Sequence, residues 1–284
     1  MTLNAPTQLL RTSNETYAYR RFGQGAPLLC LQHFTGTLDN WDPAVTDPLA
    51  SGREVILFDN AGVGRSTGKV PATISGMASH AFAFMDTLNL SSCDVLGFSL
   101  GGMIAQEMVQ QRPSIFRRMI LVGTAPRGGK DIMHVEKPSL AKFLQDPSLR
   151  GYSVLQKIFF APTDSSQTAG QAFIARLAER TEDRDAPSGP QVAAAQLAAF
   201  REWEQFTGER FAGLRDIRQP ALVVNGIHDA MIPVANSYHL AENLPNAVLL
   251  TYPDSGHGSL FQFHDSFVRQ AAAFLASDSP YAPY

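Results

Sequence analysis

The hexapeptide Gly97-Phe98-Ser99-Leu100-Gly101-Gly102 says more about the architecture than any other part of the chain. It follows a predicted strand at residues 93–97 directly, and a predicted helix at residues 100–111 begins within it. A G-x-S-x-G pattern at such a strand-to-helix turn holds its serine in a strained backbone conformation, and its glycines leave room for neighbouring backbone. The N-terminus of the helix stabilises negative charge beside the hydroxyl. The pattern predicts Ser99 as a nucleophile, and the alternative interpretation is an ordinary turn that contains glycine.

A serine hydroxyl is a poor nucleophile until a base removes its proton, so a histidine must lie within hydrogen-bond reach. His257 lies in a glycine-containing loop between the last predicted strand, 247–251, and the last predicted helix, 260–276. Loops at the carboxyl ends of parallel strands are where sheets of this class bind ligands. His257 is therefore the predicted general base. The histidines of predicted helices and of the middle of the chain are interpreted as surface or packing residues: His80, His134, His239 and His264.

The histidine needs an acid that fixes its tautomer and stabilises the imidazolium. Asp229 follows the predicted strand 221–224, again at a carboxyl end, and precedes Pro233 and a predicted helix. It is the predicted acid, and the alternative is that it caps that helix. Asp254, three residues before His257 in the same short loop, is the rival acid and is interpreted as a turn-forming residue.

Apolar runs alternate with helical periodicity elsewhere in the first half of the chain, a pattern typical of a mostly parallel sheet with crossover helices. Several runs are apolar throughout, as strands covered on both faces must be. The other predicted strands are 17–22, 27–31, 55–58 and 119–122, and the other predicted helices are 41–50, 74–88 and 234–243.

Residues 126–215 break this rhythm, because they contain no convincing strand and several amphipathic stretches. They are predicted to be a helical insertion. Within it, residues 180–190 carry mixed charges with Ser, Gly and Pro and are predicted to be an exposed loop between two helices. The amphipathic stretches are 140–144, 169–179 and 191–206.

The order Ser99, Asp229, His257 resembles that of the α/β-hydrolase superfamily, and the resemblance spans nearly the whole chain. Residues 59–66, Asp-Asn-Ala-Gly-Val-Gly-Arg-Ser, are similar to the family's D-x-x-G-x-G-x-S segment, which is structural. The resemblance implies an α/β fold of the α/β-hydrolase type: a mostly parallel eight-stranded sheet with helices on both faces. It also implies a helical cap inserted after the sixth strand.

The implied division of the chain is residues 1–125 as the first part of the core, 126–215 as the cap and 216–284 as the second part of the core. In the family the cap roofs the active site and largely sets substrate choice. Here its apolar side chains suggest a medium-sized, largely apolar substrate, although packing between cap and core is the alternative for each of them. The candidate substrate contacts are His33, Phe98, Met133, Phe159, Phe160 and Trp203.

Acyl transfer needs two backbone N–H donors aimed at the oxygen that becomes negative. The first predicted donor is Leu100. The family's second donor follows a His-Gly pair, but residues 32–36 read Gln-His-Phe-Thr-Gly, so the pattern departs from the family. The register that keeps the Thr-Gly pair assigns Phe34 as the oxyanion-hole donor, and the competing register assigns Thr35. His33, in place of a glycine, is a candidate polar contact.

A serine nucleophile disfavours the family branch with aspartate at this position, the haloalkane dehalogenases and epoxide hydrolases. The prediction is a serine hydrolase that cleaves a carboxylic ester or lactone through an acyl-enzyme at Ser99. Within the family the chain resembles small carboxylesterases and cofactor-free perhydrolases. The alternatives are a carbon–carbon bond hydrolase or a perhydrolase that uses the same triad, and a non-catalytic ligand receptor.

The composition and net charge of the chain limit the classes of partner that can be expected. With a net charge of -3 and no long basic run, neither nucleic acid nor an anionic membrane is an expected partner. Cys30 and Cys93 are predicted to be buried thiols, and no metal site, phosphate loop or cofactor is expected. No signal peptide or membrane-spanning segment is recognised. A cytoplasmic monomer or homodimer that acts on a small molecule is therefore expected.

Overall fold

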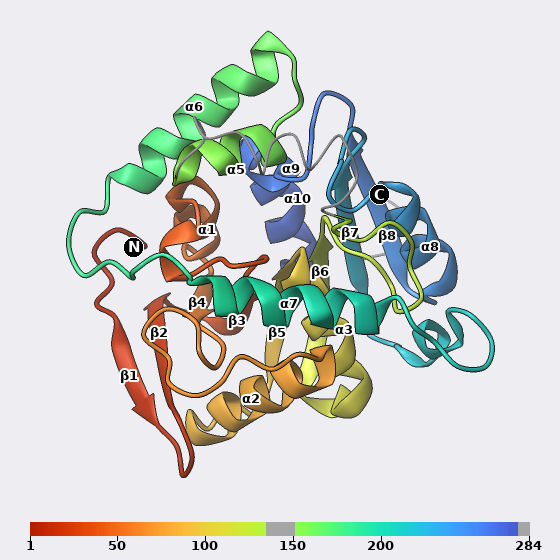
Figure 1. The fold of residues 1–284 in the computed structure, drawn as a ribbon, viewed down its shortest axis with the longest axis horizontal. Coiled ribbons are helices and arrows are strands. Elements are labelled where there is room, and N and C mark those ends of the chain that lie inside the picture. The colour runs from red at the N-terminus through yellow and green to blue at the C-terminus, as the bar shows by residue number, and fades with distance from the viewer. Residues whose placement is uncertain (135–150, 278–284) are drawn as a thin grey trace.

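One mixed sheet runs through the centre of this computed structural model, which describes residues 1–134 and 151–277 (Figure 1). Its strands are β1 (Gln8–Arg11), β2 (Thr16–Gly23), β3 (Ala26–Leu31), β4 (Arg53–Phe58), β5 (Cys93–Phe98), β6 (Phe116–Val122), β7 (Ala221–Gly226) and β8 (Ala247–Tyr252). Their order is β1-β2-β4-β3-β5-β6-β7-β8. β2 is antiparallel to β1 and β4, and the other pairs are parallel. The mostly parallel, eight-stranded sheet confirms the predicted fold class.

The seven predicted strands are β2 to β8, with bounds that differ by a few residues. The prediction omits β1. This edge strand has only four residues, and the side chain of Leu9 faces solvent. It therefore lacks the continuous apolar run that marks the covered strands.

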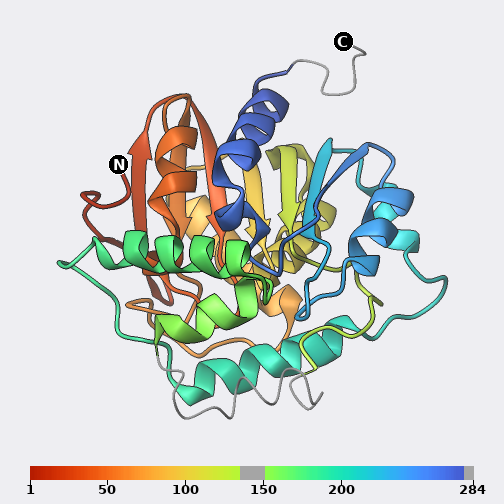
Figure 2. The same cartoon turned by 90° about the horizontal axis from the view of Figure 1, so that it is seen from above.

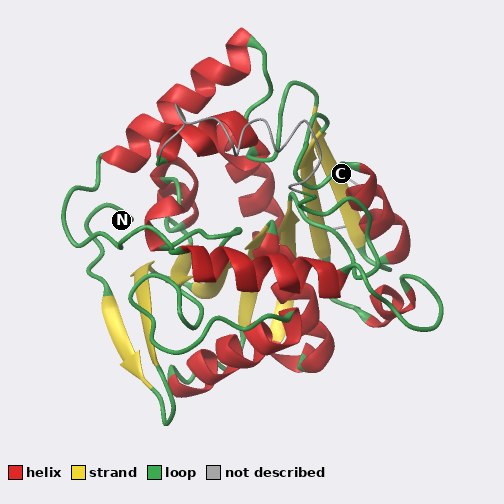
Figure 3. Ribbon diagram, in the orientation of Figure 1, coloured by secondary structure: helices red, strands yellow, loops and turns green. Residues whose placement is uncertain are grey.

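Helices cover both faces of the sheet (Figure 3). Successive side chains of a strand point to opposite faces, so Val95 and Leu96 of β5 belong to two different apolar clusters. One cluster includes α2 (Ile74–Thr87), α3 (Leu100–Gln111) and α8 (Ala235–Asn243). The other includes α1 (Pro43–Leu49), α9 (Ser259–Gln262) and α10 (His264–Ala276). Short 3₁₀ helices are η1 (Leu38–Asn40), η2 (Pro113–Ile115) and η3 (Ala212–Asp216).

The prediction of one continuous helix at residues 260–276 is wrong. The structure has α9 and α10 there, separated by Phe263, whose backbone has φ −107° and ψ 39°. The Phe263 ring stacks on the ring of Tyr252 at 4.6 Å between centroids. This tertiary contact accompanies a helix break that the apolar periodicity does not reveal. No helix in the two described ranges is long and apolar enough to cross a membrane.

Among the described residues, three α-helices lie between β6 and β7 in the chain: α5 (Tyr152–Phe159), α6 (Asp164–Ala178) and α7 (Pro190–Trp203). We call them the cap helices. Figure 2 shows them along one end of the strands, and Figure 1 shows α7 crossing in front of the sheet. The predicted stretches 169–179 and 191–206 correspond to α6 and α7. The stretch 140–144 lies outside the described residues, and the division into core and cap stays a prediction.

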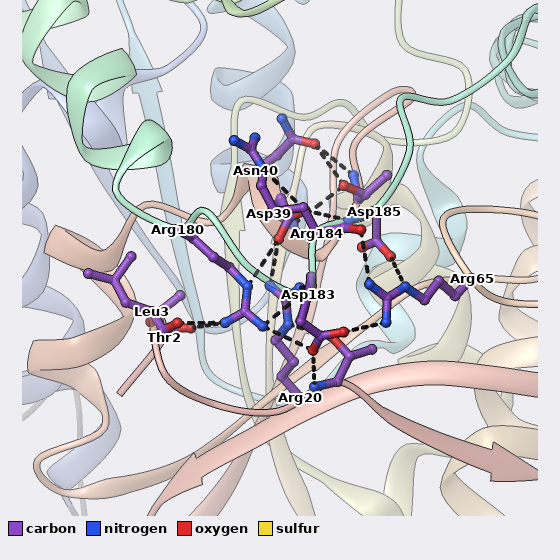
Figure 4. A network of polar contacts seen from close by, with 12 residues as sticks. Thr2, Leu3, Arg20, Asp39, Asn40, Arg65, Arg180, Asp183, Arg184 and Asp185 are labelled. Carbon is purple, nitrogen blue, oxygen red and sulfur yellow. Dashed lines mark hydrogen bonds and ion pairs between the residues drawn. The ribbon is translucent and has the colours of Figure 1, made fainter.

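The loop between α6 and α7 is anchored to the rest of the protein by buried charges (Figure 4). Arg180, only 7% exposed, donates to the carbonyl oxygen of Leu3 at 2.7 Å. Asp39 of η1 accepts the N–H of Asp185 at 2.7 Å and pairs with the fully buried guanidinium of Arg20 at 2.8 Å. The prediction that residues 180–190 are an exposed loop is therefore wrong at Arg180 and at the Asp185 side chain, which is 0% exposed.

Arg180 and the Asp185 side chain are buried because their partners come from η1 and the N-terminal segment, far away in the sequence. Removing one partner of such a buried pair leaves the other charge uncompensated, which costs about 3–5 kcal/mol. The network therefore fixes the loop between α6 and α7 at one place on the core.

Candidate active site

Ser99 lies at the turn between β5 and α3, with φ 57° and ψ −118°. For a residue with a side chain, such a backbone conformation costs about 1–3 kcal/mol and is found mainly at functional sites. The following glycine is required by space, because a Cβ atom on Gly101 would lie 2.1 Å from the carbonyl oxygen of Leu31. The strained turn that the G-x-S-x-G pattern predicts is present.

His257 and Asp229 form a buried pair. Nδ1–H of His257 donates to Oδ2 of Asp229 at 2.7 Å. The other carboxylate oxygen, Oδ1, accepts the backbone N–H groups of Met231 at 2.8 Å and Ile232 at 2.9 Å. These two bonds hold the carboxylate plane toward the imidazole. The N-cap of α8 is Val234, so Asp229 does not cap that helix.

The rival acid, Asp254, makes different contacts. Its carboxylate accepts the hydroxyls of Thr163 at 2.8 Å and Ser165 at 2.6 Å, at the start of α6. These hydrogen bonds lower the pKa of the Asp254 carboxyl. Asp254 therefore connects the loop after β8 to a cap helix. Its carboxylate binds these two hydroxyls instead of orienting His257.

The turn that holds Ser99 also packs against His257. The N–H of Ser99 donates to the carbonyl oxygen of Val122 at 2.8 Å. Gly123, the residue after Val122, lies against the imidazole, since a Cβ atom there would be 3.2 Å from the His257 ring. The ring of Phe98 is 5.0 Å from the His257 ring between centroids. The Ser99 hydroxyl is buried and has no hydrogen-bond partner within residues 1–134 and 151–277.

Two backbone N–H groups of this part of the structure are left without a hydrogen-bond partner among the described residues. Those of Leu100, the first residue of α3, and of Phe34 have no hydrogen-bond partner in the described part of the chain. The N–H of Thr35, in contrast, donates to Oε1 of Gln196 at 2.6 Å. This arrangement favours Phe34 over Thr35 as the second donor.

His33 is a buried part of the same loop. Its Nδ1–H donates to the carbonyl oxygen of Phe34 at 2.8 Å, and its Nε2 is buried without a partner among the described residues. Its ring contacts Phe98 at 5.5 Å and Phe159 at 5.1 Å between centroids. Burial lowers the pKa of His33 to about 3, so the imidazole is neutral.

This burial predicts a loss of stability in acid. Unfolded His33 takes up a proton below about pH 6.5, whereas the folded protein binds it only near pH 3. Between these values protonation stabilises the unfolded chain alone. The free energy of unfolding should therefore fall as the pH falls through this window, with a contribution from His33 on the order of a few kcal/mol.

Urea denaturation at several pH values between 7 and 4 measures this contribution. The fall should be shallower in His33→Asn, because asparagine does not titrate. His264→Asn, at a partly exposed histidine, is the control and should keep the wild-type slope. Equal slopes for His33→Asn and the wild type would contradict the assignment.

Two of the predicted substrate contacts surround the imidazole. Phe98 and Phe159 are buried, and the Phe159 ring lies 5.7 Å from the His257 ring between centroids. The carbonyl oxygen of Phe159, at the end of α5, accepts the N–H of Gly258 at 2.8 Å. The end of this cap helix is thus fixed to the loop that carries His257.

The other predicted contacts have neighbours of their own. The Phe160 ring packs against Phe173 at 5.6 Å between centroids. The N–H of Met133 donates to the carbonyl oxygen of Met231 at 2.9 Å, and Nε1–H of Trp203 donates to that of Ala125 at 3.0 Å. These contacts explain the burial of the three residues, whose contact with substrate stays a prediction.

A cavity of about 320 Å³ opens beside the loop that carries His33 and Phe34. It lies between the core and the segments around α5 and residues 184–188, and its lining combines apolar surface with several polar and charged side chains. Polar and charged residues of its lining include Thr35, Asp39, Asn40, Tyr152, Arg184 and Ser188.

The architecture and the site define a class of protein: a sheet enzyme of the α/β-hydrolase type, with a strained serine after the central strand and a carboxylate-paired histidine near it. The sequence model of the alpha/beta hydrolase fold family matches residues 26–263, and the chain belongs to this family. The protein is an enzyme of the hydrolase class.

Particular relatives agree with this assignment. A solved alpha/beta hydrolase fold protein from Chitinophaga pinensis is 41% identical, with a TM-score of 0.90 over 97% of this chain and 99% of that chain. The "Putative carbamate hydrolase RutD" of Pseudomonas savastanoi pv. phaseolicola is 28% identical over 256 residues, which are 88% of this chain and 94% of that protein. A pimeloyl-[acyl-carrier protein] methyl ester esterase of Aromatoleum aromaticum is 31% identical over 183 residues, 57% of this chain and 66% of that protein.

Proposed function

We propose that the protein is a serine hydrolase that cleaves a carboxylic ester or lactone through an acyl-enzyme at Ser99. The observation that supports this most is the buried, unpartnered hydroxyl of Ser99 on a strained turn that packs against His257. His257 is in turn held by Asp229. A hydroxyl kept free of protein partners in the interior is otherwise a cost without compensation.

In the proposed reaction, Oγ of Ser99 attacks the substrate carbonyl while its proton passes to Nε2 of His257. Because Nδ1–H of His257 donates to Asp229, Nε2 is the nitrogen left to accept that proton. The carbonyl oxygen, now negative, accepts the N–H groups of Phe34 and Leu100. Transfer of the proton from His257 to the leaving oxygen breaks the ester bond and leaves the acyl-enzyme. Water attacks next, with His257 again as base.

The proposed substrate is a small molecule of medium size with an apolar acyl group. The apolar side chains of Phe98 and Phe159, which pack against the imidazole, support this. The cavity beside Thr35 and Asn40, whose lining combines apolar surface with polar side chains, provides room for the remainder of the molecule. The relatives named as a methyl ester esterase and as a carbamate hydrolase support attack on an acyl carbon bonded to oxygen or nitrogen.

A substrate panel tests the proposal: short-chain nitrophenyl esters, simple lactones, aryl carbamates and a vinylogous diketone. We expect the esters or lactones to be turned over fastest, and a fluorophosphonate to label the protein stoichiometrically. A diketone cleaved far faster than any ester would instead identify a carbon–carbon bond hydrolase. Absence of both product burst and labelling would identify a ligand receptor.

A further inference from the structure

Gln196, on cap helix α7, reaches the loop that carries one of the two proposed oxyanion donors. Its Oε1 accepts the N–H of Thr35 at 2.6 Å, across 161 residues of sequence. The residue is only 4% exposed. Because a backbone N–H can only donate, the atom that faces Thr35 is the amide oxygen of Gln196.

Together with two other hydrogen bonds, this contact fixes the backbone of the loop. The peptide between Phe34 and Thr35 is held at both ends, since its N–H donates to Gln196 and its carbonyl oxygen accepts Nδ1–H of His33 at 2.8 Å. In the preceding peptide, the carbonyl oxygen of His33 accepts the N–H of Gly36 at 3.1 Å. The remaining group of these two peptides, the N–H of Phe34, has no partner in the described part of the chain.

The loop needs such external support because its backbone is strained. Thr35 has φ 58°, a left-handed conformation that costs a residue with a side chain about 1–3 kcal/mol. Without an acceptor at Gln196, the N–H of Thr35 would also be left unsatisfied. Both costs would be relieved by rotation of the backbone around Thr35, which would move the adjacent N–H of Phe34.

Helix α7 holds this loop at a second point. The ring of Phe200, one helical turn after Gln196, lies 5.9 Å from the ring of Phe34 between centroids. A small cavity is lined by His33, Gln196 and Leu100, which carries the other proposed donor. The loop of Phe34 thus contacts α7 at two points, Gln196 and Phe200.

We infer that Gln196 is a positioning residue, which holds the N–H of Phe34 in place for the negatively charged oxygen of the transition state. The inference rests on the proposed function. It makes the seating of α7 on the core a condition for stabilising that oxygen, while Ser99, His257 and Asp229 are held by other contacts.

Gln196→Leu removes the acceptor with little change of size. Since loss of a whole oxyanion donor lowers kcat by about 10²–10³-fold, displacement of one should lower kcat by roughly 10–100-fold and change KM by less than about threefold. Affinity for an alkyl boronic acid, which forms a tetrahedral anion on the serine, should fall by a similar factor. Labelling by a fluorophosphonate should still reach one equivalent.

Val192→Ala is the matched control, because Val192 is buried on the same helix, one turn before Gln196. It should lower thermal stability while kcat and boronic acid affinity stay within about twofold of the wild type. A Gln196→Leu protein with wild-type kcat would overturn the inference. Equal losses of kcat in the two variants would show a purely structural role and overturn it as well. An unlabelled, inactive wild type would instead refute the proposed function.

Discussion

Ser99→Ala is expected to lower the turnover of any ester substrate by about 10⁴–10⁶-fold, with a small residual rate from binding and the oxyanion donors. Alanine removes the one atom that forms the acyl-enzyme, while the turn keeps its backbone hydrogen bond to Val122. The measurement is kcat on the fastest ester of the panel, with thermal unfolding followed by circular dichroism to show that the variant is folded.

Ser259→Ala is the matched control for this loss. The Ser259 hydroxyl is also buried and without a partner among the described residues, but it is the first residue of α9 instead of a strained strand-to-helix turn. Burial alone does not make a nucleophile, so this variant should keep kcat within about threefold of the wild type. Wild-type turnover by Ser99→Ala would refute the catalytic assignment.

The sequence predicts the sheet well because its information is local. Runs such as residues 221–224 are apolar throughout since both faces of the strand are covered, and this pattern is visible without knowledge of any partner. The same holds for Ser99, His257 and Asp229. Each follows a strand whose carboxyl end lies at the same edge of the sheet, so strand assignment alone places them near one another.

What the sequence does not predict depends on contacts between distant segments. Charges in residues 180–190 suggest a solvated loop, yet Arg180 is buried because the carbonyl oxygen of Leu3 accepts its hydrogen bond. Helix α5 is short, and the sequence does not reveal that its end is fixed by the hydrogen bond from Gly258 to Phe159. Gln196 looks like any polar helix residue until its partner, the N–H of Thr35, is known.

The choice between Phe34 and Thr35 as the second oxyanion donor also depends on a contact between distant segments. From sequence it is a question of register, because residues 32–36 depart from the family pattern. In the structure it becomes a question of hydrogen bonding, since Gln196 occupies the N–H of Thr35 and leaves that of Phe34 free within the described residues. The deciding contact comes from a helix 161 residues away.

Asp229→Asn is expected to lower kcat by about 10⁴-fold, although it changes a single atom. Asp229 Oδ1 accepts the N–H groups of Met231 and Ile232, so the carbonyl oxygen of an asparagine must occupy that position. Its NH₂ group then faces Nδ1 of His257. Two donors cannot face each other, so Nδ1 becomes the acceptor and Nε2 carries the proton. An imidazole in this tautomer cannot take the proton of Ser99.

Asp254→Asn separates this effect from the loss of a carboxylate near the site. Asp254 accepts hydrogen bonds from Thr163 and Ser165 at the start of α6, and the amide oxygen of an asparagine can still accept one of them. Its kcat should therefore stay within a few-fold of the wild type, in the same ester assay that shows the large loss in Asp229→Asn. The reverse order of effects would transfer the role of the acid to Asp254, because only the carboxylate that fixes the tautomer of His257 can carry so large a part of the rate.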